Sequence, residues 1–213
     1  MRRLVVLGVI VGCAVAAVTV PARASASGST RCNNQTLGAV TVSGNLVVPA
    51  GAFCDLEGTH VTGSADVART GGLLAENGAT IDGSVSVDHN AQFAAFSGAT
   101  VGGSIECDGC QVADVQDSTV KGSLTDNSLT MGAFIKNSHF GGSLLIRDSV
   151  DGGFGFSLAS NSVGGNLTFN DNSGSSTISG NTIGHTLSCR GDTPPPTGAG
   201  NTAASKKGQC AGL

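Results

Sequence analysis

The segments VTGSADV from Val61, IDGSVSV from Ile81 and VGGSIEC from Val101 repeat one pattern of glycine, serine and apolar residues every 20 residues. Five further segments extend the series in both directions: VSGNLVV from Val42, VKGSLTD from Val120, FGGSLLI from Phe140, VGGNLTF from Val163 and IGHTLSC from Ile183. Self-similarity at a fixed period of this length is the signature of one structural unit stacked on copies of itself. The chain is therefore expected to be a solenoid.

Within each segment the residue types keep fixed places. Counting the first residue as position 0, apolar residues recur at positions 0, 4 and 6, glycine at position 2 and serine or asparagine at position 3. The exceptions at positions 2 and 3 are His185 and Thr186 in the last segment. Positions 4 and 6 have the period of a strand, so their side chains point to one face. The glycine at position 2 predicts a corner that needs a positive φ or a close backbone approach.

Stacking such units places the residues of position 0 in one interior column and those of position 4 in a second. A looser third column lies five residues before each start and holds Leu56, Phe96, Val115, Ile135, Leu158 and Ile178. Glu76 falls at the same place and indicates a register slip or an outward turn. We predict an all-β, single-domain parallel β-helix of about eight coils of roughly 20 residues over residues 42–189. The handedness rule for parallel crossovers favours a right-handed helix.

The first 26 residues are predicted to be a secretory signal peptide. Two arginines precede an apolar run over residues 4–20, and the small-residue cleavage site ASA ends at Ala26. A retained membrane anchor is one alternative, although the run is short for a bilayer and no stop-transfer cluster follows it. Residues 10–13 also resemble a lipobox, which would make Cys13 a lipidated first residue.

Both ends of a solenoid expose unpaired strand edges, which normally need caps. Residues 27–41 are expected to cap the N-terminal end, because Cys32 ties them to the first coil. Residues 190–213 lose the repeat, carry three consecutive prolines and return to Cys210, so they would form a C-terminal cap or a flexible tail. The predicted organisation is a signal peptide, an N-terminal cap, the repeats, and a C-terminal cap or tail.

Six cysteines remain after signal cleavage: Cys32, Cys54, Cys107, Cys110, Cys189 and Cys210. An even number in an exported chain indicates disulfides, and six cysteines allow about 15 pairings. Their positions favour three local bridges, Cys32–Cys54, Cys107–Cys110 and Cys189–Cys210. Zinc is the alternative for the CxxC pair, but no second pair or nearby histidines complete four ligands. A thioredoxin-like redox role would need a strand-then-helix context that the sequence lacks.

The composition excludes several functional classes. The chain has 33 Gly and is only 12% charged, so neither a helical domain nor a disordered chain is expected. Its formal charge of -4, with no basic cluster, excludes sequence-independent nucleic-acid binding. It holds no Trp or Tyr, the aromatic residues on which sugar platforms and protein hot spots depend, which disfavours high-affinity glycan binding.

One outward face is expected to carry acidic residues. Asp66 and Glu106 share position 5 two coils apart, and Asp88 and Asp108 share position 7 on adjacent coils. Carboxylates suit calcium, so these four residues are a weak candidate calcium site, and a solvated acidic face is the simpler interpretation. Catalysis by such a pair would need a cleft, and regular coils leave little chain to build one. No catalytic residue and no cofactor is predicted.

The coils VSGNL, VGGSI and VGGNL, followed by NTIGHTLSC, a proline run, GAGNT and a terminal KKGQC, resemble a group of uncharacterised small secreted proteins of actinobacteria. This resemblance covers nearly the whole mature chain and implies a secreted β-helical protein. A second similarity, of pattern rather than motif, is to the bactofilins, polymer-forming β-helical cytoskeletal proteins. Bactofilins are cytoplasmic, whereas this chain carries a predicted export signal and paired cysteines.

The sequence predicts a secreted bacterial protein with a structural or surface-interaction role and no catalytic role. Long polar faces on a rigid rod suit lateral contact, either with further copies or with cell-envelope polymers. No membrane span would remain after signal cleavage. A polysaccharide lyase or hydrolase is the alternative, because many large β-helices are such enzymes. The NTD, DD, GHG and RIK motifs of galacturonan hydrolases do not occur, however, and His185 lies in GHT instead.

Overall fold

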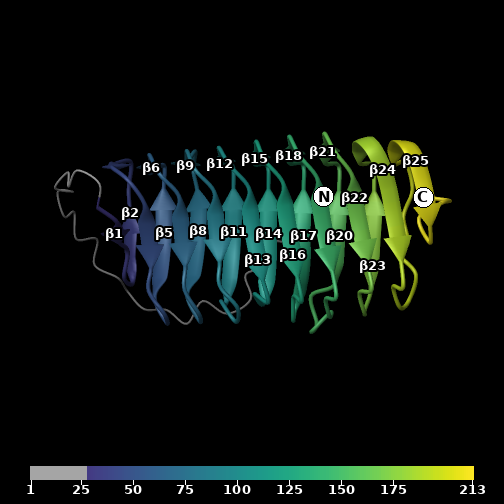
Figure 1. The fold of residues 1–213 in the computed structure, drawn as a ribbon, viewed down its shortest axis with the longest axis horizontal. Coiled ribbons are helices and arrows are strands. Elements are labelled where there is room, and N and C mark those ends of the chain that lie inside the picture. Colours follow the sequence, from purple (N-terminus) through teal and green to yellow (C-terminus); the bar gives the residue numbers. More distant parts are fainter. Residues whose placement is uncertain (1–27) are drawn as a thin grey trace, which may run out of the picture.

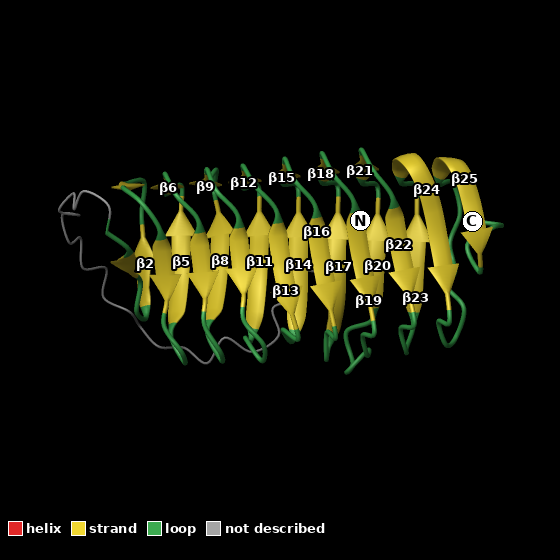
Figure 2. Ribbon diagram, viewed as in Figure 1, coloured by secondary structure: helices red, strands yellow, loops and turns green. Residues whose placement is uncertain are grey.

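The computed structural model describes residues 28–213, and the coils follow one another along the long axis in sequence order (Figure 1). The predicted signal peptide and Cys13 lie outside these residues. The described chain is an all-β parallel solenoid of about nine turns in a single domain, and no helix occurs in it (Figure 2). The predicted fold class is confirmed, with about one turn more than expected.

Two sheets run along the rod, and their strands pair in parallel, coil upon coil. The eight-stranded sheet consists of β2 (Gln35–Leu37), β5 (Phe53–Glu57), β8 (Gly72–Glu76), β11 (Phe93–Ser97), β14 (Val112–Gln116), β17 (Gly132–Lys136), β20 (Phe156–Ala159) and β23 (Ser176–Ser179). The 17-stranded sheet consists of β1 (Thr30–Arg31), β3 (Thr41–Val42), β4 (Leu46–Val48), β6 (His60–Val61), β7 (Ala65–Val67), β9 (Thr80–Ile81), β10 (Val85–Val87), β12 (Thr100–Val101), β13 (Ile105–Asp108), β15 (Thr119–Val120), β16 (Leu124–Asn127), β18 (His139–Phe140), β19 (Leu144–Arg147), β21 (Ser162–Val163), β22 (Leu167–Asn170), β24 (Thr182–Arg190) and β25 (Thr202–Gly208).

The hydrophobic core is a set of stacked columns inside the coils. Val61, Ile81 and Val101 are aligned across β6, β9 and β12, and all three are buried. Ala65 and Val85 belong to the second column and are aligned and buried in the same way. Apolar surface removed from water stabilises a fold by roughly 25 cal/mol per Å², so these columns provide the main favourable contribution.

The third column departs from even spacing at one coil. Ala75, not Glu76, is aligned with Phe96 and is buried. The turn that follows holds two residues with left-handed φ, Asn77 at 55° and Gly78 at 82°. This turn is one residue longer than the corresponding turn of the next coil, which shifts the register by one and directs Glu76 outward.

The Gly-Ser motif forms a corner at which successive coils touch. The backbone N–H of Ser104 donates to Ser84 Oγ at 3.1 Å, and the N–H of Ser84 donates to Ser64 Oγ at 3.2 Å. A Cβ on Gly103, just before Ser104, would lie 2.3 Å from Ser84 Oγ. Because Gly103 does not have a left-handed φ, the reason for glycine here is the close approach rather than the backbone conformation.

Two further ladders of side chains run along other corners. In one, Asn161 Oδ1 accepts the N–H of Ser138 at 3.1 Å, and its Nδ2 donates to the carbonyl of Ile135 at 2.7 Å. In the other, Asn172 Oδ1 accepts the N–H of Ser149 at 3.1 Å. Both asparagines are buried, so they supply the partners that water would otherwise give to the turn backbone.

The C-terminal segment continues the solenoid. β25 pairs in parallel with β24, and Lys206 lies opposite Leu187, at the position that is aliphatic in all eight repeat segments. Its Nζ donates to the carbonyl oxygen of Leu213, and the side chain of Leu213 packs against the core. The chain end therefore covers the last coil, and a charged residue lies where a further coil would stack. Such inward-facing charges discourage edge-to-edge association.

Disulfides fasten the chain near both ends. Cys32 is bonded to Cys54 over a sequence separation of 22 residues, and Cys189 is bonded to Cys210 over 21 residues. The first bridge joins the N-terminal segment to the coil that contains β5, and the second joins β24 to the turn after β25. Cross-links of this length stabilise a fold by about 3 kcal/mol, mainly by restricting the unfolded chain.

We expect Gly103→Ala to lower the free energy of unfolding by about 1–3 kcal/mol, because the added Cβ pushes the corner away from Ser84. Thermal and urea unfolding followed by circular dichroism would measure the change. Gly38→Ala is the matched control, since a Cβ on Gly38 meets nothing within 4 Å and should change stability by less than about 0.5 kcal/mol. Equal destabilisation by the two substitutions would contradict the close-approach explanation.

We expect Lys206→Leu to cause self-association, because it removes the inward-facing charge and continues an apolar column into the last coil. Size-exclusion chromatography with light scattering would show species larger than the monomer at concentrations where the parent chain is monomeric. Lys207→Leu is the control, since Lys207 lies opposite Ser188 and is exposed. If both variants stay monomeric, Lys206 does not protect this end.

Candidate functional site

One carboxylic acid lies inside the apolar core. Asp126 on β16 is fully buried and is aligned with Cys107 below it and Ile146 above it in an interior column. Neither carboxylate oxygen has a hydrogen-bond partner. Burial alone raises the pKa of Asp126 to about 8, since no neighbouring charge contributes. An unsatisfied buried polar group costs roughly 1–3 kcal/mol, so this residue is not explained by stability.

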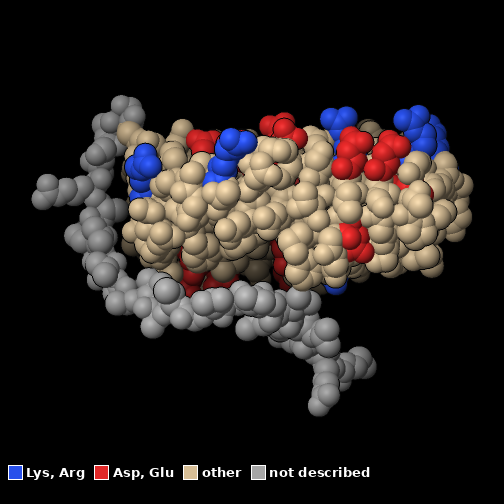
Figure 3. Space-filling view, turned by 90° about the horizontal axis from the view of Figure 1, so that it is seen from below, with Lys and Arg blue, Asp and Glu red and all other residues tan. Residues whose placement is uncertain are grey.

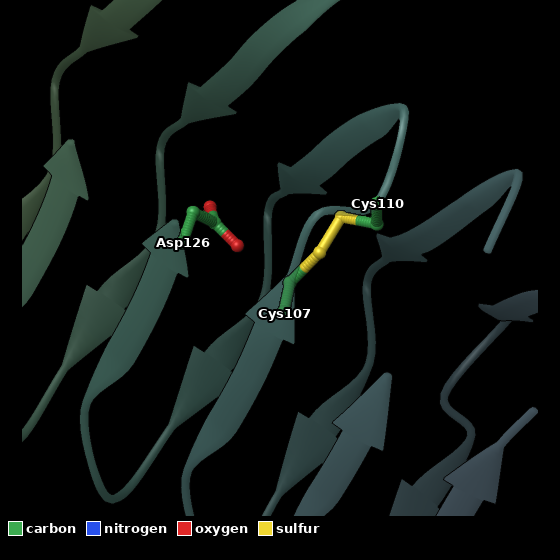
Figure 4. Close-up of side chains that lie close together, drawn as sticks. All are labelled: Cys107, Cys110 and Asp126. Atoms are coloured by element: carbon green, nitrogen blue, oxygen red, sulfur yellow. A yellow bond between two sulfur atoms is a disulfide. The ribbon is translucent and has the colours of Figure 1, made fainter. Parts of the chain in front are cut away.

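A disulfide lies directly beside this acid. Cys107 at the end of β13 is bonded to Cys110 in the following corner, and both sulfurs are buried. One carboxylate oxygen of Asp126 and the two sulfur atoms all lie within 4.8 Å of one another. Figure 4 shows the carboxylate of Asp126 directed toward the disulfide from the neighbouring strand. The three side chains form a compact buried cluster, here called the Cys-Cys-Asp cluster.

The sequence contained a signal for this cluster that the analysis of motifs missed. In VKGSLTD, Asp126 occupies position 6, which is Val, Cys, Ile or Phe in the other segments. An acid at a column position predicts either an outward slip or a buried polar site. The zinc interpretation of Cys107 and Cys110 searched for further ligands along the chain, whereas the nearest acidic group comes from the next coil.

The four predicted calcium ligands all lie on the exterior. Asp66 and Glu106 flank Ser86 on successive strands, while Asp88 directly follows β10 and Asp108 ends β13. All four are exposed. Among residues 28–213, neither group of three metal-binding side chains includes any of them. Figure 3 shows acidic side chains in small separate groups among uncharged residues on the face it displays.

A second acidic group lies on the outer side of the eight-stranded sheet. Asp55 and Glu57 on β5 and Glu76 on β8 bring one oxygen each within 4.8 Å of one another. The pKa of Asp55 is raised to about 6, chiefly by burial and then by the charge of Glu76, while a hydrogen bond from Thr36 opposes the rise. The ring of Phe53, two residues before Asp55, packs against that of Phe93 with the centroids 5.7 Å apart and the ring planes tilted by 45°.

This acidic trio was not predicted. The acids predicted to form a site lie on the strands that follow the glycine corner, whereas this trio lies on the eight-stranded sheet. The predicted register slip or outward turn at Glu76 is confirmed, because the Asn-Gly pair after it forms a turn with left-handed φ and Glu76 lies outside, next to Glu57.

The exterior also has a shallow hollow over the short strands. His60, Asp82 and Lys121 contribute to its lining. The Nε2 atom of His60 lies 2.9 Å from Oδ2 of Asp82, and both side chains are about half exposed. An exposed pair of this kind contributes little to stability, and the hollow is open to solvent.

Comparison with known proteins finds no relative of this chain. No protein-family model, no curated protein and no solved structure matches the chain. The similarities to secreted actinobacterial proteins and to bactofilins therefore gain no support beyond the parallel β-solenoid itself. Within residues 28–213 there is no helix long and apolar enough to cross a bilayer.

We expect Asp126→Asn to stabilise the oxidised protein at pH 7 by on the order of 2–4 kcal/mol. Between about pH 4 and pH 8 the folded protein keeps the proton of Asp126 while the unfolded chain loses it, so the parent becomes less stable as pH rises and levels off above about pH 8. Urea unfolding at several pH values between 4 and 9 would measure how the free energy of unfolding of the parent and of the variant depends on pH. The variant should lack the fall in stability that the protonation of Asp126 causes in the parent.

Asp108→Asn is the matched control, because Asp108 is an exposed acid in the loop of the same disulfide. It should leave the pH dependence of stability as it is in the parent. Parallel curves for the parent and Asp126→Asn would show that Asp126 is ionised in the folded protein at neutral pH.

Proposed function

We propose that this chain is an exported, non-catalytic protein that makes lateral contacts at a surface. The observation that carries the proposal is the regularity of the coils: ladders close their corners, so the molecule offers long sheet faces rather than loops around a cleft. The predicted signal peptide and the disulfides fit an oxidising compartment outside the cytoplasm.

The outer side of the eight-stranded sheet is the surface that best suits such contact. Its outward positions carry apolar side chains that are half-buried or exposed, here called the sheet surface: Phe53, Leu74, Phe93, Val112 and Phe134. Phe154, from the loop before β20, packs edge-on against Phe134 with ring centroids 6.3 Å apart, and Lys136 lies 5.7 Å from the centre of the Phe134 ring. Contiguous apolar patches rimmed by polar groups are typical of interaction surfaces.

A cell-envelope polymer is the partner we propose for the sheet surface. The covered C-terminal end and the charge of Lys206 oppose stacking of further copies, so a polymer of the bactofilin kind is not proposed. The rod would instead lie along an extended partner, which a flat face several coils long can contact over many repeats.

We expect the oxidised protein to be monomeric and to co-sediment with insoluble cell-envelope polymers. Phe93→Ser combined with Phe134→Ser should reduce the bound fraction at least about fivefold, because the double change removes two of the three aromatic rings of the sheet surface and the apolar area they contribute. Leu145→Ser is the control, since it removes a half-buried apolar side chain from the outer side of the other sheet. Equal binding by all variants, or no co-sedimentation of the parent, would contradict the proposal.

A polysaccharide-acting enzyme is the second candidate, and the acidic trio favours it. Asp55, with its pKa raised to about 6, would protonate a leaving glycosidic oxygen, and Glu76 would act as the nucleophile or base. Oxygens within 4.8 Å of one another fall near the roughly 5 Å carboxyl spacing of retaining glycosidases. The acidic trio and the sheet surface lie on the same side of the eight-stranded sheet, so the sheet surface would then bind a polysaccharide as substrate.

Release of reducing ends from a panel of neutral and acidic polysaccharides would test this candidate. Activity that falls at least about 100-fold in Asp55→Asn and is unchanged in Asp66→Asn, an exposed acid on the other sheet, would support it. No product from the parent, combined with retained co-sedimentation, would leave the non-catalytic proposal as the explanation of the surface.

A further inference from the structure

We propose that the Cys-Cys-Asp cluster, once its disulfide is reduced, is a binding site for a thiophilic divalent ion of the zinc class. Cys107 and Cys110 would bind the ion as thiolates and Asp126 as a carboxylate. The proposal is independent of the proposed surface function, because the cluster lies in the core and the sheet surface lies outside.

The geometry of the cluster suits one ion. A single oxygen of Asp126 lies within 4.8 Å of both sulfur atoms, which are bonded to each other in the oxidised protein. Zinc binds sulfur at about 2.3 Å, so after reduction the two sulfurs must move apart to the spacing of roughly 3.8 Å that two thiolates have on one tetrahedral ion. The carboxylate oxygen already lies close enough to become the third ligand. Cys107 and Asp126 are held in register by the pairing of β13 with β16, and Cys110 returns from the corner of the same coil. The parallel stack thus brings together donors from two coils.

The unpartnered carboxylate is the second and independent indication of a ligand. Asp126 is 0% exposed, and no hydrogen bond reaches either oxygen. At the same place neighbouring coils have Cys107 and Ile146, which need no polar partner. A bound cation would give this carboxylate the partner that the protein does not, whereas an apolar residue would serve packing better.

The chemistry of the donors selects the ion. Two thiolates favour zinc and related soft or borderline ions over calcium and magnesium, which prefer oxygen ligands. Three protein ligands leave one position of a tetrahedral zinc ion, which a water or a further ligand would fill. The other two disulfides lack this arrangement, since neither belongs to a group of three metal-binding side chains in the described residues.

The disulfide must be broken first, and the step balances as an ordinary exchange. A dithiol attacks one sulfur and forms a mixed disulfide, and its second thiol then displaces the protein sulfur. The S–S bond of the protein gains two electrons and two protons, and the dithiol is oxidised to its own disulfide. Binding of the ion then releases the protons of the two thiols and of Asp126 to solvent.

The test uses the full chain without its predicted signal peptide, reduced with a water-soluble phosphine that is removed under anaerobic conditions. Zinc alone is titrated against a chromophoric chelator. We expect the reduced parent to bind one zinc ion per chain more than the Cys107→Ser, Cys110→Ser double variant. The oxidised parent should bind no more zinc than that variant. Cobalt substitution should give the sulfur-to-metal charge-transfer absorption of thiolate ligation.

Two single substitutions distinguish a zinc ligand in the cluster from a nearby acid that does not bind zinc. Asp126→Asn should weaken zinc binding at least about tenfold while leaving the protein folded by circular dichroism. Asp108→Asn, an exposed acid between the two cysteines, should bind as the parent does. X-ray absorption of the zinc-loaded parent needs no variant and should show two sulfur ligands together with oxygen. No zinc in excess of the double variant, or equal affinity in Asp126→Asn, would overturn the proposal.

Discussion

At the Gly-Ser corner, and at the two other corners in the later coils, a small polar side chain reaches the backbone of the adjacent coil, and the stacking of the coils depends on that contact. Parallel strands stack about 4.8 Å apart, a distance that a serine hydroxyl or an asparagine amide bridges when its coil has no bulky group in the way. The contact of Ser84 with Ser104 shows the consequence, because Gly103 has no room for a Cβ. An asparagine can make a second hydrogen bond to the backbone. Asn181 Oδ1 accepts the backbone N–H of Asn161, and its Nδ2 donates to the carbonyl of Leu158.

The core follows from these corners. Once the corners fix the rise and register, equivalent positions must stack, and any apolar residue of suitable size fills its column. Contacts in such a stack are made almost only between neighbouring coils, so the ends have no second layer to support them. The disulfides of Cys32 and Cys189 and the inward Lys206 lie at those ends.

The sequence period predicted the parallel stack and its first two columns, because the period is a property of one coil repeated. What lies between coils was harder to predict. The turn at Asn77 and Gly78 adds one residue, so Ala75 and not Glu76 lies in the column. The acid at that position predicted the slip, but not which acids it would bring together. The acidic trio then arises from that slip. The Cys-Cys-Asp cluster joins side chains 16 to 19 residues apart, and only the register of β13 on β16 shows that they meet.

Asp126 also gives the rod an internal boundary. Stability in a stacked protein is approximately a sum of the coils' own contributions and the interfaces between neighbours, so one weak interface matters more than it would in a globular core. The coils below Asp126 include the Cys32 bridge, and those above it include the Cys189 bridge, while the serine ladders continue across the interface between β13 and β16. Ionisation of Asp126 would weaken that interface, so local opening of the rod is expected to begin there rather than at a bridged end.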